Sequence, residues 1–332
     1  MLKSVEVCAG AGGQALGLEN AKFQHLACVE LDPQACITLR TNRPQWNVLQ
    51  QDLNEWSGRK YQGQVDLFAG GVPCPPFSKA GKQLGQDDER NLFPRALKLV
   101  GEIEPKAVMI ENVRGLLDPV FTPFRQRIDA ELRGMGYVPG WRLLNASDYG
   151  VSQLRPRVVL VALKHELAGG FSWPAKSKIP APSVGELLRD LMSANGWEGA
   201  SAWADGASSI APTLVGGSHK HGGPDLGPTR ARKAWAALGV EGRTIAEAAP
   251  GRGFKGMPRL TVQMGARVQG FPPDWVFTGP KTAGWRQVGN AFPPPVAEAV
   301  ARQIAKAIKA RVPAHGNSFP FTSGDGELPL AV

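Results

Sequence analysis

Residues 3–19 read KSVEVCAGAGGQALGLE, and this stretch decides the fold. The apolar run of residues 3–8 predicts a strand, the glycines after it predict a tight turn, and a helix is expected from Gln14. Strands and helices then alternate through the first half of the chain. Further strands are predicted at 25–31, 46–50, 65–69, 106–112, 137–146 and 157–163, with helices from Pro33 and at 91–103 and 124–136. This alternation predicts an α/β fold built on a doubly wound, mostly parallel sheet.

The alternation stops after Lys164. Residues 165–258 are rich in Gly, Pro, Ala and Ser and contain only short helix candidates. Helical periodicity returns at 259–271 and in an amphipathic stretch at 296–310. The predicted units are a larger domain of residues 1–165 plus 282–312, a smaller irregular domain of residues 166–281, and a flexible tail of residues 313–332.

The composition is that of a globular chain with room for a sizeable core, since 42% of its 332 residues are apolar. No stretch is long and apolar enough to cross a membrane, and the N-terminus lacks the regions of a signal peptide, so we expect a cytoplasmic protein. The four cysteines show no C-x-x-C spacing, which argues against a disulfide framework and against a metal site.

The net charge of +9 is unevenly distributed along the chain. An ordinary basic protein could carry such a charge on a mixed surface. Between Leu214 and Arg259, however, eight Lys and Arg stand against three Asp and Glu, together with ten glycines. Cationic, glycine-rich loops suit a backbone that approaches phosphates closely, so this segment indicates a polyanionic partner.

The glycine turn after the first strand fits a cofactor-binding pattern. Gly10, Gly12 and Gly13 match the loose form of G-x-G-x-x-G/A. Glu30 lies twenty residues after Gly10, at the end of the second strand, where a carboxylate can hold ribose hydroxyls; Asp52 follows the third strand. Such turns also close strands without binding anything, and the pattern does not separate a nicotinamide cofactor from S-adenosylmethionine.

The cysteine of GGVPCPPFSKAG (70–81) is a candidate nucleophile. Cys74 follows a predicted strand and stands between Pro73 and Pro75, whose fixed φ angles hold a side chain stiffly at the carboxyl end of the sheet. The cations Lys79 and Lys82 follow it and favour a thiolate. The alternative is a small buried apolar residue, the usual role of a free cysteine.

Charged residues at the ends of two more strands complete the candidate site. Glu111 follows four apolar residues of the fifth strand, so its carboxyl group should be partly desolvated, with a raised pKa. Gln153, Arg155 and Arg157 alternate along an approaching strand, which places the two guanidinium groups on one face. Such a pair suits phosphate or carboxylate recognition, but an exposed strand face would show the same pattern.

Taken in order, these motifs resemble those of the DNA (cytosine-5)-methyltransferases of bacterial or phage restriction–modification systems. The resemblance spans nearly the whole chain except about residues 168–257 and the tail. The motifs that carry it are GAGG (10–13), ELD (30–32), PCPPFS (73–78), ENV (111–113), QLRPR (153–157), RLTV (259–262), QGFP (269–272) and QVGNAFP (287–293).

The resemblance implies the S-adenosylmethionine-dependent methyltransferase fold and a covalent mechanism. Cys74 would attack carbon 6 of cytosine, and Glu111 would contact ring nitrogen N3 and the exocyclic amine. Arg155 and Arg157 would hold the flipped nucleotide and orient the glutamate. Carbon 5 then takes the methyl group, and loss of its proton with elimination frees Cys74.

The resemblance also implies S-adenosylmethionine as cofactor and S-adenosylhomocysteine as product. The implied cofactor-binding residues are Cys8, Gly10, Gly12, Gly13, Glu30, Leu31, Asp52, Leu53, Pro73, Leu92, Asn290 and Ala291. Cys8 departs from the family, which usually has an aromatic residue there to pack on the adenine. Adenine stacking must therefore be weaker here or be supplied elsewhere.

Double-stranded DNA is the implied partner, and the target base must rotate out of the helix. The smaller domain becomes the target-recognition domain, and the expected DNA contacts are Ser78, Lys82, Gln153, Lys220, Arg230, Arg232 and Lys233. We expect a monomer, with a cognate endonuclease as a genetic rather than a physical partner. Two alternatives stay open here: a tRNA cytosine-5 methyltransferase, and a catalytically silent DNA-binding protein of the same fold.

Overall fold

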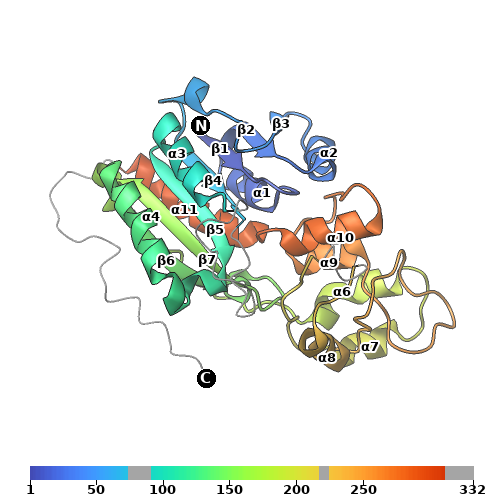
Figure 1. Ribbon diagram of the computed structural model, residues 1–332. Helices are drawn as coiled ribbons and strands as arrows, with labels where there is room; N and C mark the ends of the chain where they lie inside the picture. Colours follow the sequence, from blue (N-terminus) through green and yellow to red (C-terminus); the bar gives the residue numbers. More distant parts are fainter. Residues whose placement is uncertain (74–90, 217–223, 311–332) are drawn as a thin grey trace.

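A seven-stranded sheet forms the centre of the larger part of the molecule (Figure 1). The computed structural model describes residues 1–73, 91–216 and 224–310. The strands are β1 (Leu2–Val7), β2 (Phe23–Glu30), β3 (Val48–Gln50), β4 (Leu67–Gly70), β5 (Ala107–Val113), β6 (Tyr137–Asn145) and β7 (Pro156–Lys164). Their order across the sheet is β3-β2-β1-β4-β5-β7-β6. Strands β1 to β5 are parallel, whereas β7 is antiparallel to both of its neighbours. The predicted mostly parallel sheet is confirmed.

Helices cover both faces of the sheet, as a doubly wound fold requires. α3 (Phe93–Ile103) and α4 (Thr122–Gly134) pack on one face, and α1 (Gly13–Asn20) and α11 (Pro294–Lys309) pack on the other (Figure 1). α11 lies against α1 although more than 270 residues separate them in sequence. Gly17 permits this close approach, because a Cβ atom there would lie 2.6 Å from the carbonyl oxygen of Pro294.

The sequence places the start of α2 (Pro33–Asn42) directly after β2. Asp32 caps this helix, since its Oδ1 accepts hydrogen bonds from the backbone N–H groups of Gln34 at 2.7 Å and Ala35 at 3.2 Å. Pro33 occupies the first turn, where a missing N–H group costs nothing. The short link leaves Glu30 at the carboxyl end of β2, facing the cavity described below.

The smaller part of the molecule consists of short helices around a tryptophan-rich core. Trp203, Trp235 and Trp285 are buried there, in a cluster that continues without a break to Leu39 of α2. The remaining helices are α5 (His165–Ala168), α6 (Val184–Ser193), α7 (Ala200–Gly206), α8 (Thr229–Ala237), α9 (Val262–Val268) and α10 (Lys281–Asn290), with 3-10 turns η1 (Arg59–Tyr61), η2 (Arg114–Leu117), η3 (Pro119–Phe121) and η4 (Ala146–Tyr149).

The sequence did not predict α5, α7 or α10. α10 packs against α9, and its Trp285 and Val288 belong to the shared core. The predicted domain boundary at residues 281–282 therefore coincides with the start of a helix that is packed into the smaller part. None of the helices in the described ranges is long and apolar enough to cross a bilayer.

Candidate active site

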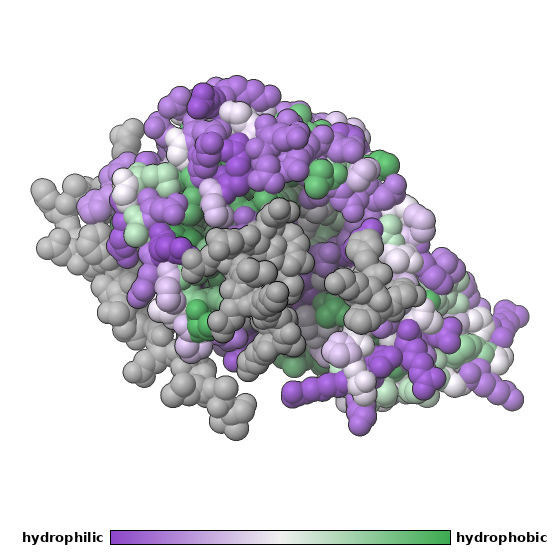
Figure 2. All heavy atoms as spheres, in the orientation of Figure 1, coloured by the Kyte–Doolittle hydropathy of each residue, from purple (hydrophilic) through white to green (hydrophobic). Residues whose placement is uncertain are grey.

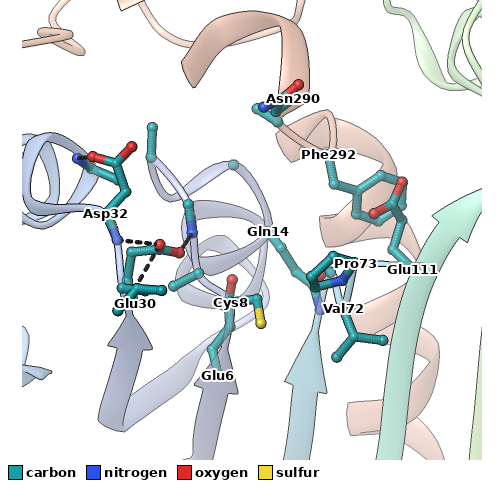
Figure 3. Close-up of a pocket in the computed structure, with 18 of the residues that line it drawn as sticks. Glu6, Cys8, Gln14, Glu30, Asp32, Val72, Pro73, Glu111, Asn290 and Phe292 are labelled. Atoms are coloured by element: carbon teal, nitrogen blue, oxygen red, sulfur yellow. Dashed lines mark hydrogen bonds between the residues drawn. The ribbon is translucent and has the colours of Figure 1, made fainter. Parts of the chain in front are cut away.

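A cavity of about 630 Å³ opens at the carboxyl ends of β1, β2, β4 and β5, the edge where open α/β sheets bind ligands (Figure 3). Glu30 stands on one side of it and Glu111 on the other, with Cys8 and Gln14 between them (Figure 3). Residues from the far end of the sequence close the cavity, since Asn290 and Phe292 also line it.

The glycine turn shapes the floor of the cavity. Gly10 has a φ of 53°, and a Cβ atom at this position would find no atom within 4 Å, so its backbone borders open space. Gly13 lets α1 start directly against the opposite wall, because a Cβ atom there would clash with the carbonyl oxygen of Phe292. Gly12 does not line the cavity. Its φ of 88° favours glycine, and a Cβ atom there would lie 2.9 Å from the Trp275 ring, so the backbone requires glycine here; the cofactor contact of Gly12 stays a prediction.

Glu30 is held in one orientation by its own backbone surroundings. Its Oε2 accepts a hydrogen bond from the N–H of Gly10 at 2.7 Å, and its Oε1 accepts from the N–H groups of Leu31 and Asp32, both at 2.8 Å (Figure 3). A carboxylate offers about four acceptor positions, so these three bonds leave capacity for a hydroxyl donor. Leu31 is exposed at the rim of the cavity.

Five further residues of the predicted cofactor set line the same cavity. They are Asp52, Leu53, Pro73, Leu92 and Ala291. Leu53 and Ala291 are buried, whereas Leu92 is half-buried at the start of α3. The cavity thus combines an acid on each of two neighbouring strand ends with an apolar lining, which suits a nucleoside with ribose hydroxyls.

Two polar residues at the base of the cavity were missed from the sequence. Gln14 is buried, and neither its Oε1 nor its Nε2 has a hydrogen-bond partner; Oε2 of buried Glu6 is also unpartnered. Burial raises the pKa of Glu6 well above its ordinary value, although the hydrogen bond from the Ala15 backbone acts to lower it. The charge of Glu30 raises this pKa further. The signal was available in the sequence, because Glu6 is the one acid in an otherwise apolar strand end.

Cys8 is a neutral thiol in this position. Burial raises the pKa of Cys8, and the nearby charges of Glu30, Glu6 and Asp52 raise it further. A thiol that resists ionisation is a poor nucleophile. Cys8 lines the cavity beside Glu30 with a φ of 51°, a left-handed backbone conformation that few non-glycine residues adopt.

Glu111 and Arg157 form an ion pair at the other side of the cavity. The Nε of Arg157 lies 2.8 Å from Oε1 of Glu111, and both side chains are largely buried. Burial raises the pKa of Glu111, although Arg157 and then Arg155 act to lower it. Asn112, the next residue, donates from Nδ2 to the carbonyl oxygen of Val72 at 3.1 Å. The end of β5 is thus tied to the segment that leads to Cys74, a residue outside the described ranges.

Arg155 and Gln153 are buried and do not line the cavity, and their expected contacts with the flipped nucleotide and with DNA stay predictions. The Arg155 side chain is 1% exposed and absent from the cavity lining; it donates to the carbonyl oxygens of Leu214 and Gly289, both at 2.7 Å. Gln153 is fully buried and bonded to Gln269 and Leu214. Arg157 lies in β7 and lines the cavity, whereas Arg155 directly precedes β7 and does not line it.

The predicted DNA contacts divide between described and undescribed residues. Arg230 and Lys233 are exposed on α8, whereas Arg232 is half-buried and donates to Thr229 at 3.3 Å. Hydrophilic side chains project from the smaller part of the molecule in Figure 2. Ser78, Lys82 and Lys220 lie outside the described residues. Within residues 1–73, 91–216 and 224–310, no cluster of His, Cys, Asp and Glu could hold a metal ion.

The strand order, the glycine turn and the acid at the end of β2 define a doubly wound α/β protein that binds a nucleoside-containing cofactor at the carboxyl edge of its sheet. A model of the C-5 cytosine-specific DNA methylase family matches residues 2–306. The chain belongs to this family and is a DNA cytosine-5 methyltransferase, and membership of the family implies S-adenosylmethionine as the methyl donor.

Individual relatives agree with the family match. The chain is 55% identical to the Type II methyltransferase M.NgoMIV of Neisseria gonorrhoeae, over 92% of this chain and 98% of that protein. It is 56% identical to M.NaeI of Lentzea aerocolonigenes, over 92% of this chain and 75% of that protein. These relatives favour the DNA enzyme over the tRNA enzyme and over a silent DNA-binding protein.

Solved structures agree on the fold. A protein from E. coli, described as a DNA modification methyltransferase encoded within a prophage, aligns with a TM-score of 0.67 and 22% identity, over 93% of this chain and all of that one. Dnmt2 methyltransferase of S. pombe aligns with a TM-score of 0.63 and 17% identity, over 93% of this chain and all of that one.

Proposed function

We propose that the chain methylates carbon 5 of a cytosine that has rotated out of duplex DNA, through a transient bond between Cys74 and carbon 6. The observation that carries this proposal is the Glu111–Arg157 pair. It lies in the same cavity as Glu30, and Asn112 ties its strand to Val72, two residues before Cys74. Base and cofactor would therefore meet between β2 and β5.

The cavity residues fit S-adenosylmethionine. Glu30 would receive the ribose hydroxyls, and Asp52 and Leu53 would lie around the adenine, with Leu31 also at the cofactor. The unpartnered amide of Gln14 supports a charged or polar ligand, since a buried polar group without a partner is costly. When bound, the cofactor supplies the methyl group.

Glu111 would assist the attack by Cys74. Burial raises the pKa of Glu111, so its carboxyl group holds a proton closer to neutral pH than an exposed glutamate does. Donation to ring nitrogen N3 neutralises the charge that develops there as the sulfur bonds to carbon 6. Arg157 fixes the carboxyl group from 2.8 Å and prevents its rotation away from the base. Removal of the carbon 5 proton then allows elimination, which frees Cys74.

Duplex DNA would be held by the basic smaller part, with Arg230 and Lys233 of α8 as phosphate contacts. Rotation of one nucleotide out of the helix costs a few kcal/mol, which phosphate contacts on both sides would offset. The enzyme would act as a monomer in the cytoplasm, with an endonuclease of the same site specificity as its genetic companion.

The test is a Cys74→Ala variant assayed for methyl transfer on duplex DNA and on tRNA in parallel. We expect the variant to bind duplex normally and to show no turnover. Cys28→Ala is the matched control, because Cys28 is fully buried in β2 and free. Unchanged turnover by Cys74→Ala would remove the nucleophile assignment, and parent activity on tRNA alone would overturn the DNA substrate. Bisulfite sequencing of DNA from cells that express the chain identifies the methylated site.

A further inference from the structure

Three buried side chains join the catalytic sheet to the smaller part of the molecule. We call Gln153, Arg155 and Gln269 the polar hub. Gln153 donates to Oε1 of Gln269 at 2.6 Å and accepts from the N–H of Leu214 at 2.7 Å. Gln269 in turn donates to the carbonyl oxygen of Ala291. Each of the three side chains is at most 1% exposed.

Arg155 connects two backbone segments that are remote from it in sequence. One nitrogen of its guanidinium group donates to Leu214, 59 residues away, and the other donates to Gly289, 134 residues away. Its Nε is buried without a partner, and burial lowers the pKa of Arg155, as does the charge of Arg157. Burying a charged group is costly. Because both bonds go to main-chain carbonyl groups, the side chain holds two backbone segments rather than a ligand.

The two segments that Arg155 holds also touch each other directly. A Cβ atom added at Gly289 would clash with the backbone of Val215 and Gly216. A Cβ atom added at Gly216 would lie 2.5 Å from Oδ1 of Asn290. No side chain separates the two backbones here, so a shift of either segment must move the other.

One segment lines the cavity, and the other leads to α8, which carries the proposed phosphate contacts. Gly289 and Asn290 line the cavity beside the glycine turn. On the other side, Val215 packs against Gly227, since a Cβ atom at Gly227 would lie 3.0 Å from Cγ2 of Val215. Gly227 is followed by α8, which carries Arg230. A chain of direct contacts therefore leads from the cavity wall to the basic helix.

We propose that Arg155 is a positioning residue that couples the cofactor cavity to the segment of residues 214–216 and to α8. A ligand that contacts Gly289 and Asn290 reduces the local opening of that wall. Through the polar hub it also reduces the opening of residues 214–216, so this segment and the neighbouring α8 are more ordered when the cavity is filled. This inference rests on the proposed cofactor site. It assigns to Arg155 a role that requires no contact with the flipped base.

Hydrogen exchange with mass spectrometry on the full-length protein tests the proposal, with saturating S-adenosylhomocysteine as the unreactive ligand. In the parent protein we expect the ligand to slow exchange in peptides covering the cavity wall and also, by about fivefold or more, in peptides covering residues 212–216 and 224–233. In Arg155→Met the cavity peptides should still be protected, whereas the effect on residues 212–216 and 224–233 should be lost.

Two further variants separate coupling from general destabilisation. Arg125→Met is the matched control, since Arg125 also donates to backbone carbonyl groups, those of Leu116 and Asp118, but outside the hub. It should keep the parental pattern. Gly289→Ala keeps the Arg155 side chain but forces the backbones of Gly289 and Gly216 apart, and with them the carbonyl oxygen that Arg155 binds, so it should uncouple the two segments in the same way as Arg155→Met.

The outcomes distinguish this inference from the proposed function. Protection of the cavity peptides alone in the parent protein would overturn the coupling and leave the proposed function intact. Retention of the full effect in a folded Arg155→Met variant would also overturn it. Absence of any ligand-dependent protection at the cavity would remove the cofactor assignment and this inference together.

Discussion

Acidification should destabilise the protein through protonation of His25, whose ring joins β1 to α1, the helix that follows the glycine turn. Nδ1 of His25 lies 2.9 Å from Oγ of Ser4, and Nε2 lies 3.0 Å from the carbonyl oxygen of Ala15 in α1. Nε2 donates to this carbonyl oxygen, and in the neutral ring Nδ1 accepts from the Ser4 hydroxyl, so the neutral form satisfies both ring nitrogens. Trp46 packs edge-on against it, with 4.6 Å between ring centroids. Burial lowers the pKa of His25 from 6.5 to about 4, although the Ala15 hydrogen bond and the charge of Glu19 raise it.

The size and sign of the effect follow from this shift. As the pH falls, the unfolded chain takes up the proton near pH 6.5 and the folded chain only near pH 4, so stability is fully present above this window and falls within it. At 1.36 kcal/mol per unit the complete loss is about 3 kcal/mol, of which about 2 kcal/mol is reached by about pH 5.

Urea unfolding of the parent and of His25→Asn between about pH 4.5 and about pH 7.5 measures this contribution. The variant should be less stable at neutral pH because it loses packing against Trp46, but it lacks the histidine titration. The difference in the free energy of unfolding between the two proteins should therefore shrink by about 2 kcal/mol between about pH 7.5 and about pH 5. Parallel curves over this range would refute the assignment of a neutral, buried His25.

Three further changes test the cavity and the DNA surface. Gly13→Ala should weaken S-adenosylhomocysteine binding about tenfold or more in calorimetry, because the new methyl group would push the Phe292 backbone into the cavity. Unaltered affinity would contradict the close approach of Gly13 to the Phe292 backbone. Glu111→Gln should slow methyl transfer by about 10² to 10⁴ while duplex binding persists, and an equal loss of both would argue for a structural role. Arg230→Ala should weaken duplex binding and lower the slope of log K against log salt by about one; identical slopes would move the phosphate contacts elsewhere.

The local parts of the fold were predictable from sequence. The strand of residues 3–8, the glycine turn and the helix after it are each defined by neighbouring residues, and the structure has them as β1, the turn and α1. Strand–helix alternation then requires both faces of the sheet to be covered. Short helices such as α7 escaped prediction because seven residues carry too little periodicity, and they are stabilised by burial of side chains such as Trp203.

The residues of the site were predictable only where strand position decided the outcome. Glu30 and Glu111 reach the cavity because each stands at the carboxyl end of a strand. Arg155 could not be distinguished from Arg157, since strand alternation gives a face and not a distance from the cavity. Leu214 and Gly289, which are its partners, are remote in sequence, and no local pattern indicates that they meet it.

A mechanism-based trap tests the central claim, that one sulfur atom bonds to the target base. The substrate is a duplex that carries the mapped methylation site with 5-fluorocytosine at the target position, incubated with S-adenosylmethionine and the parent enzyme. Fluorine cannot leave carbon 5 as a proton does, so the intermediate should accumulate and mass spectrometry should find the nucleotide attached to the peptide that contains Cys74. An adduct on a different residue, or no adduct with enzyme that methylates the ordinary duplex, would contradict the account.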